Sequence, residues 1–168
     1  MPDLTERRPL VLVADPNPET TVLIERRLEW AHYGVVTASC GAEAMEILEE
    51  KRPEAAILEV VLGDMTGYDF VREIRTQPAN RLMAIALMSE RAGALDREFA
   101  FTVGADEYFR KPFCSADVVA RLAELIPDTE ARVARLEPRS TSPVRIARRP
   151  ARRSLQPAEA AAVAVLAR

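Results

Sequence analysis

The chain has 168 residues, which fits one domain of ordinary size with a modest extension. Hydrophobic residues make up 48% and charged residues 29%, a balance that excludes a largely disordered or fibrous protein. The two cysteines, Cys40 and Cys114, exclude a disulfide scaffold and a four-ligand zinc site. The single histidine, His32, excludes most histidine-based catalysis.

Charge is distributed unevenly along the chain. Residues 1–126 hold 14 Lys and Arg against 22 Asp and Glu, a net charge of −8, whereas residues 127–168 hold nine Arg against four acidic residues, a net charge of +5. This asymmetry predicts two parts with different roles. We expect a domain at 9–126 and, at 127–168, a short helix followed by a flexible, partly disordered basic tail rich in Pro, Arg and Ser.

No apolar run approaches the ~20 residues of a membrane span, and the first residues lack the apolar segment of a secretory signal. A cytoplasmic location without a membrane partner is the resulting expectation.

Apolar runs predict five strands, in chain order at 10–14, 35–38, 55–58, 83–88 and 107–109. Apolar residues at helical spacing follow each strand, at about 18–31, 44–48, 67–74, 95–103 and 118–125. Asn17 before Pro18, and Thr66 three residues before Asp69, are helix-start signals. This alternation predicts a parallel sheet with helices on both faces.

Polar side chains follow four of the predicted strands, where the functional groups of such sheets gather. They are Asp15, Glu59, Ser89 and Lys111. We expect these four side chains to lie together at one edge of the sheet.

Over about residues 9–126 the chain resembles the receiver domain of bacterial two-component response regulators. The similarity rests on LVLVADPNP (10–18), HYGVVTASCGAEAMEIL (32–48), PEAAILEVVLGDMTG (53–67), IALMS (85–89) and GADEYFRKPF (104–113). The resemblance implies an α/β, flavodoxin-like fold with a doubly wound five-stranded parallel sheet in the order 2-1-3-4-5.

The resemblance also implies a site. In that family an aspartate after the third strand accepts a phosphoryl group from a histidine kinase, and two acidic residues after the first strand help to bind magnesium. Lys111 and Ser89 match the lysine and hydroxyl that contact the phosphoryl oxygens, Tyr108 matches an aromatic switch residue, and Asp15 matches the first acidic residue.

Two positions depart from the family pattern: Glu59 stands at the phosphoacceptor position and Pro16 at the second acidic position. Glu59 has one methylene more than aspartate, and a misplacement of about 1 Å can cost on the order of 10²-fold in rate. Pro16 offers no side-chain oxygen to magnesium, so we expect weak or absent metal binding, with Asp15 as a weak candidate ligand. A Glu59–Lys111 pair would instead imitate an aspartyl phosphate in part.

These departures favour an atypical response regulator: a non-enzymatic pseudo-receiver that signals by protein–protein contact. The family resemblance implies a contact face formed by the fourth helix, the fifth strand and the fifth helix, near Tyr108. A strand aromatic such as Tyr108 is more often packed than a moving switch, although its position favours surface exposure. A sensor kinase and a second copy of the chain are the other partners considered.

Other interpretations stay open. The chain could be a phosphorylatable receiver with a non-standard site such as Asp64, although a loop aspartate is more often a solvated turn residue. Glu59 could be a chance substitution in a structural domain that does not switch. Lys111 could serve solely to neutralise the charges of Asp15 and Glu59. Ser89 could cap the helix that follows it. The tail could bind nucleic acid electrostatically through Arg145, Arg148, Arg149, Arg152 and Arg153, although the composition favours a solvated tail or one folded back on the acidic body.

Overall fold

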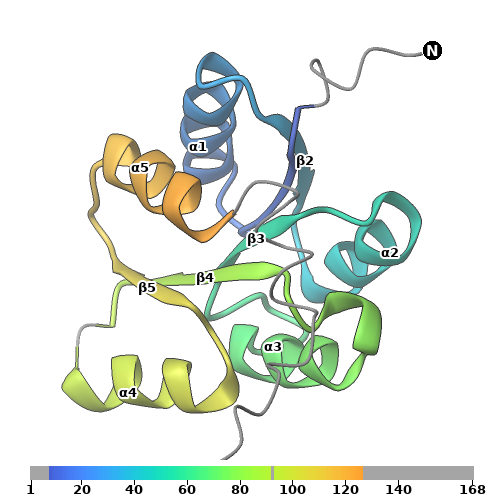
Figure 1. Ribbon diagram of the computed structural model, residues 1–168. Coiled ribbons are helices and arrows are strands. Elements are labelled where there is room, and N and C mark those ends of the chain that lie inside the picture. Colours follow the sequence, from blue (N-terminus) through green and yellow to red (C-terminus); the bar gives the residue numbers. More distant parts are fainter. Residues whose placement is uncertain (1–7, 92, 127–168) are drawn as a thin grey trace, which may run out of the picture. The chain divides into compact units, whose positions relative to one another are not determined.

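The computed structural model describes residues 8–91 and 93–126 (Figure 1). Strands and helices alternate along these residues: β1 (Leu10–Ala14), α1 (Pro18–Trp30), β2 (Gly34–Ala38), α2 (Gly41–Lys51), β3 (Ala55–Glu59), α3 (Gly67–Thr76), the 3-10 turn η2 (Pro78–Asn80), β4 (Ala84–Ser89), α4 (Ala94–Val103), β5 (Glu107–Arg110) and α5 (Ser115–Leu125). Each predicted strand is present with its ends within one residue of the expectation. The helix and the basic tail expected at 127–168 lie outside the described residues.

The strands form a parallel sheet in the order β2-β1-β3-β4-β5, which confirms the expected topology. Helices α1 and α5 cover one face, and α2, α3 and α4 cover the other (Figure 1). Alternate residues of β1 supply the two cores, because successive side chains of a strand point to opposite faces. Leu12 packs in the core under α2 and α3, whereas Val11 and Val13 pack under α1 and α5.

The predicted helix starts are confirmed. The side chain of Asn17 accepts a hydrogen bond from the backbone N–H of Glu19 at 3.0 Å, and that of Thr66 accepts one from the N–H of Asp69 at 3.1 Å. His32, two residues after the last residue of α1, has a φ of 66°, the left-handed conformation in which helices commonly end.

The turn between α4 and β5 fixes the strand that leads to Lys111. Gly104 adopts a φ of 110°, which glycine tolerates without strain. The carboxylate of Asp106 accepts a hydrogen bond from the N–H of Ile85 at 2.8 Å and forms an ion pair with Arg75 at 2.9 Å. Arg75 also donates to the carbonyl oxygens of Gly104 and Met83, both at 2.8 Å. These bonds tie α3, β4 and β5 into one rigid corner.

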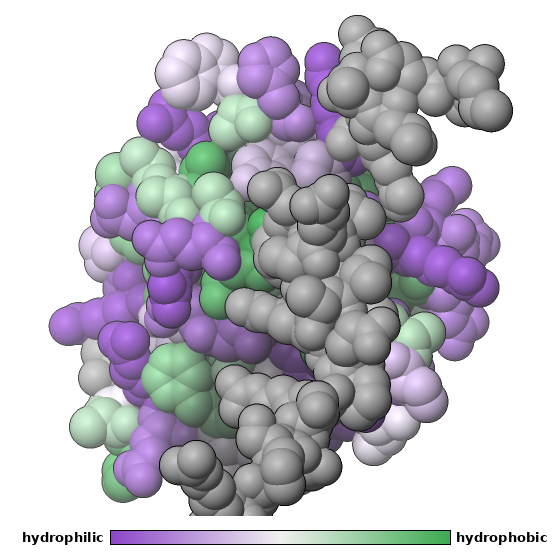
Figure 2. All heavy atoms as spheres, viewed as in Figure 1, coloured by the Kyte–Doolittle hydropathy of each residue, from purple (hydrophilic) through white to green (hydrophobic). Residues whose placement is uncertain are grey.

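Helix α4 is present where predicted, but of the apolar stripe that indicated it only Val103 packs against the core. Leu95 is 79% exposed and Phe99 is 42% exposed, whereas Ala100 is fully buried. Phe99 instead packs edge-to-face on Tyr68 of α3, with 4.9 Å between ring centroids. Apolar side chains consequently stand among charged ones over α4 (Figure 2).

Across the residues that the structure describes, no helix has the length and apolar character needed to cross a membrane.

Candidate functional site

The four polar side chains expected at one edge of the sheet do meet there. Asp15 follows β1, Glu59 ends β3, Ser89 ends β4 and Lys111 follows β5. All four line one hollow, and Asp15, Glu59 and Ser89 are buried. The parallel pairing of β1 with β3, β3 with β4, and β4 with β5 brings these strand ends side by side.

Lys111 is the centre of the site. Its Nζ donates to Oδ2 of Asp15 at 2.6 Å and also to Oε2 of Glu59. Burial alone would lower the pKa of Lys111, but hydrogen bonds and charge from the two carboxylates outweigh burial and raise that pKa above its usual value. The side chain is 17% exposed, so the pair is partly buried. The expected Glu59–Lys111 ion pair is confirmed.

The remaining carboxylate oxygens are held by the backbone. Oδ1 of Asp15 accepts a hydrogen bond from the N–H of Asn17 at 2.7 Å, and Oε1 of Glu59 accepts one from Val61 at 3.3 Å. Pro16, between Asp15 and Asn17, lines the hollow without a side-chain oxygen. In the described segments 8–91 and 93–126, no group of three or more His, Cys, Asp and Glu side chains is placed to hold a metal ion.

Ser89 orders the loop that follows β4. Its Oγ accepts a hydrogen bond from the N–H of Arg91 at 3.1 Å. The interpretation of Ser89 as a helix cap is wrong, because α4 starts at Ala94 and Gly93 occupies its N-cap position. The backbone carbonyl of Ser89 accepts from the N–H of Lys111 at 2.8 Å, so the ends of β4 and β5 are held together.

Tyr108 lies inside the protein, which confirms the interpretation of a packed strand aromatic, and the expectation that its position favours exposure is wrong. Only 6% of the residue is accessible, and its hydroxyl donates to the carbonyl of Arg91 at 2.8 Å. This bond ties β5 to the loop before α4. Burial, and after it the electrostatic effect of the nearby Tyr108, raises the pKa of Tyr68 to about 12.

Asp64 has a structural role that the sequence did not reveal. Its carboxylate accepts hydrogen bonds from the N–H groups of Gly41 at 2.7 Å and Ala42 at 2.8 Å, at the start of α2. These bonds lower the pKa of Asp64. Cys40, the N-cap residue of α2, makes no such bond with its side chain. Cysteine is a poor N-cap residue, so Cys40 was the one sign in the sequence that the N–H groups of α2 need another acceptor. The sequence does not show that Asp64 is that acceptor.

Sequence comparison identifies relatives of this chain. Residues 11–123 match the family model described as "Response regulator receiver domain". The chain is 31% identical over 119 residues to the probable transcriptional regulatory protein TcrX of Mycobacterium tuberculosis, covering 71% of this chain and 50% of the relative. It is 29% identical over 120 residues to the alkaline phosphatase synthesis transcriptional regulatory protein PhoP of Bacillus subtilis, covering 71% and 49%. The chain therefore spans about half the length of the curated relatives it matches.

Solved structures show the same fold. The chemotaxis response regulator CheY4 of Vibrio cholerae superposes with a TM-score of 0.67 at 25% identity, covering 71% of this chain and 99% of that one. A putative response regulator from Chloroflexus aurantiacus superposes with a TM-score of 0.69, also at 25% identity, covering 71% and 98%. Both matches span nearly the whole of the solved chains.

Proposed function

The chain belongs to the response regulator receiver domain family, and from this premise we propose that it is an atypical receiver in phosphorelay-type signalling. In this proposal Glu59 occupies the phosphoacceptor position, the site does not turn over phosphate, and the domain acts by binding other proteins. The function is regulatory rather than enzymatic.

The observation that carries the proposal is the ion pair of Lys111 with Glu59 and Asp15. In the family, the matching lysine contacts oxygens of the transferred phosphoryl group. Here a carboxylate oxygen of Glu59 already takes that contact, because its additional methylene extends the carboxylate toward Nζ. The pair supports a site that stays in one state and partly imitates the phosphorylated one.

Magnesium fits this donor set poorly. The ion requires near-octahedral oxygen ligands. Pro16 supplies none, and one oxygen each of Asp15 and Glu59 is already bound to Lys111. Weak or absent magnesium binding is therefore part of the proposal, and Asp15 would be the main protein ligand of any bound ion.

Titration calorimetry with magnesium chloride tests whether magnesium binding is weak or absent. Wild type and the single variant Glu59→Asp should release little heat, whereas Pro16→Asp combined with Glu59→Asp should bind at least about tenfold more tightly, because two carboxylates then follow β1. Pro18→Asp combined with Glu59→Asp is the matched control, since it places the same charge two residues further on. Wild-type binding as tight as that of the Pro16→Asp double variant would refute the proposal.

The proposed contact surface is the face formed by α4, β5 and α5. Glu107 of β5 forms ion pairs with Arg97 of α4 at 3.5 Å and with Arg121 of α5 at 2.7 Å. These ion pairs link the three elements into one surface that carries the exposed Phe101. Tyr108 lies beneath this surface and connects it to the loop after β4. A partner protein is the expected ligand, and a second copy or a sensor kinase are the alternatives.

Nucleic-acid binding is the second candidate, because TcrX and PhoP are named as transcriptional regulatory proteins. The residues that would carry it, the arginines at 145–153, lie outside the described residues. Duplex binding that falls steeply with salt and is lost when these arginines are replaced by alanine would support this candidate. A phosphoacceptor role for Asp64 is disfavoured, since its carboxylate is engaged at the start of α2.

A further inference from the structure

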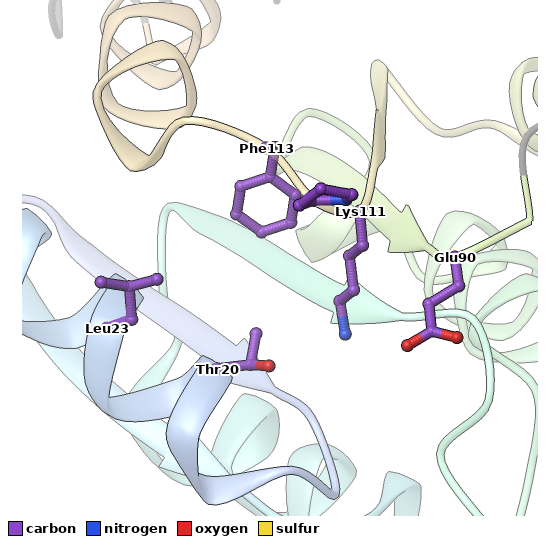
Figure 3. A pocket seen from close by; sticks show the side chains of 6 residues that line it. Thr20, Leu23, Glu90, Lys111 and Phe113 are labelled. Atoms are coloured by element: carbon purple, nitrogen blue, oxygen red, sulfur yellow. The ribbon is translucent and has the colours of Figure 1, made fainter.

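Two hollows border helix α1. One, of about 440 Å³, lies on the side of α1 that faces the segment after β5, with Leu23 and Phe113 in its lining (Figure 3). The other, of about 270 Å³, lies on the side of α1 that faces β2 and α2. Thr37 lines this second hollow from β2, Glu25 from α1 and Glu43 from α2. Because β2 is the first strand in the order of the sheet, the second hollow lies beside a sheet edge.

The outer edge of β2 has unpaired backbone groups. The N–H of Gly34 and the carbonyl of Ala38 bond to the residues that flank β1, at 2.9 Å and 3.1 Å. Backbone groups of successive strand residues point alternately to the two sides, so those of Val35 and Thr37 point away from β1. Within residues 8–91 and 93–126, β1 is the one strand that pairs with β2. The N–H and C=O groups of Val35 and Thr37 are therefore available to another strand.

The two edges of the sheet differ in how well they resist an added strand. Strand β5, Glu107–Arg110, has a charged residue at each end and is followed by Lys111 and Pro112. Charge and proline at an edge disfavour pairing with another chain. The sequence of β2, GVVTA, has neither, and its residues 35–37 are β-branched and partly exposed. The edge of β2 is consequently suited to accept a strand from another molecule.

The hollow at the end of β2 is negatively charged. Its described lining contains the carboxylates of Asp15, Glu25 and Glu43, and no lysine, arginine or histidine. Asp15 is paired with Lys111, but Glu25 and Glu43 form no ion pair with any residue that the structure describes. Hydrogen bonds from the backbone N–H of Ser39 at 2.7 Å and from its hydroxyl at 2.9 Å lower the pKa of Glu43, which keeps this carboxylate ionised. Charge complementarity therefore favours a cationic side chain in the hollow.

We propose that the edge of β2 accepts an extended basic segment of a partner protein as an additional strand. The backbone of that segment bonds to Val35 and Thr37, and one of its lysine or arginine side chains enters the hollow and pairs with Glu25 and Glu43. A second copy of β2 fits poorly, because it brings no cation and adds the same two glutamates. This edge lies across the sheet from β5, and its use does not depend on whether Glu59 accepts a phosphoryl group.

Amide hydrogen exchange on the full chain tests the backbone contact. In the free protein the N–H groups of Val35 and Thr37 should exchange quickly, and that of Val36 slowly, because it bonds toward β1. A saturating acetylated peptide of alternating valine and arginine should slow exchange at Val35 and Thr37 at least about tenfold. Unchanged exchange at both positions would overturn the proposal. Protection of both positions that grows with protein concentration in the absence of peptide would identify a second copy as the occupant and would also overturn it.

Fluorescence anisotropy with the labelled peptide separates backbone pairing from charge. The valine–arginine peptide should bind at least about tenfold more tightly than its valine–glutamate counterpart. It should also bind at least about tenfold more tightly than a version N-methylated at alternate residues, which keeps the charge but loses the donors that face β2. Equal affinity for the N-methylated peptide, or no binding of any peptide, contradicts strand addition.

A matched pair of variants tests the position of the cation. Glu25→Lys should weaken binding of the valine–arginine peptide by about fivefold, since it reverses a charge in the hollow. Glu98→Lys makes the same change at an exposed position of α4 and should weaken binding less than about twofold. Equal losses in the two variants would indicate general attraction to an acidic domain and would overturn the proposal.

Discussion

At the scale of single residues, the extra methylene of Glu59, compared with aspartate, brings its carboxylate into contact with Lys111. The ammonium group of Lys111 is placed by β5 and reaches the carboxylates that end β1 and β3. Aspartate at position 59 would leave room between its carboxylate and Nζ for another group. Glutamate fills that space, so the lysine is engaged without any further ligand.

Replacing Lys111 should destabilise the protein by an intermediate amount. Lys111→Ala leaves Asp15 and Glu59, both buried, beside each other without a cation. Breaking a buried pair costs roughly 3–5 kcal/mol and a surface pair about 0–1 kcal/mol, so a loss between these bounds is expected for this partly buried pair. Urea denaturation measures it, with Lys51→Ala at the exposed end of α2 as the control. An unchanged midpoint for Lys111→Ala would mean that the pair does not contribute.

The pH dependence of this stability has a defined sign. Folding raises the pKa of Lys111, so the stabilisation is fully present below the ordinary lysine pKa and is lost as the pH rises through the folded-state value. The difference in unfolding free energy between wild type and Lys111→Met should therefore be constant at neutral pH and should shrink in strongly alkaline solution. A difference that falls between pH 5 and 8 would point to another group.

Sequence reasoning could place Lys111, Glu59 and Asp15 together because each directly follows a strand, and strand ends of a parallel sheet meet. It could not place Asp64 at the start of α2, because that contact joins residues 22 positions apart through the path of a loop. It allowed for a packed Tyr108 but wrongly favoured exposure at that position, because the loop that covers its hydroxyl has no sequence pattern that reveals its course.

At the scale of elements, the loop after β3 and the start of α2 stabilise each other. Asp64 supplies the capping carboxylate that Cys40 lacks, and Gly41 leaves space for Met65, which a Cβ at position 41 would strike. The helix start therefore depends on a residue of another loop. Helix α4 shows the same limit, since the contact of Phe99 with Tyr68 of α3 joins residues far apart in the sequence.

Removing the carboxylate of Asp64 should lower stability, and a local cap should restore part of it. Asp64→Ala leaves two N–H groups of α2 without their partner, so the midpoint of urea denaturation should fall. Adding Cys40→Ser to that variant should raise the midpoint again, because serine at an N-cap can accept from the helix. The same Cys40→Ser change in wild type is the control and should have a smaller effect. Equal effects of Cys40→Ser in both backgrounds would contradict this account.

The capping contribution should also depend on pH. Hydrogen bonding lowers the pKa of Asp64, so its stabilisation is present above the ordinary aspartate pKa and is lost as the pH falls through the lowered value.

At the scale of the whole molecule, the strand order separates the two thiols. Cys40 stands at the N-cap of α2 after β2, and Cys114 at the N-cap of α5 after β5, so they follow opposite edges of the sheet. Four inter-strand steps of about 4.8 Å separate those edges by roughly 19 Å. A disulfide requires Cα atoms within about 7 Å. Both cysteines are free in the structure, as expected.

Thiol titration of the native protein should therefore find two free sulfhydryl groups. Cys114 is exposed and Cys40 only partly so, which predicts that Cys114 reacts first. Cys114→Ser should remove the fast phase and leave the slow one. An intrachain Cys40–Cys114 bond found by mass spectrometry in the folded monomer would be incompatible with this strand order.

The topology was predictable because five apolar runs and five amphipathic segments alternate along the chain, and the receiver resemblance supplied the strand order. In the function proposed above, what the molecule does with that topology depends on two residues, Glu59 and Pro16, whose effect is chemical rather than architectural. The described residues share the fold of CheY4, which superposes with a TM-score of 0.67.

Intact-mass spectrometry after incubation with acetyl phosphate and magnesium tests the central claim most directly. The account predicts that the wild type gains no acid-labile phosphoryl group, that Glu59→Asp gains little, and that Glu59→Asp with Pro16→Asp gains more. Asp64→Asn in the same assay separates labelling at the loop from labelling at the strand end. Robust labelling of the wild type at Glu59 or Asp64 would contradict the account, because the site would then still perform the transfer that the Lys111 pair is proposed to replace.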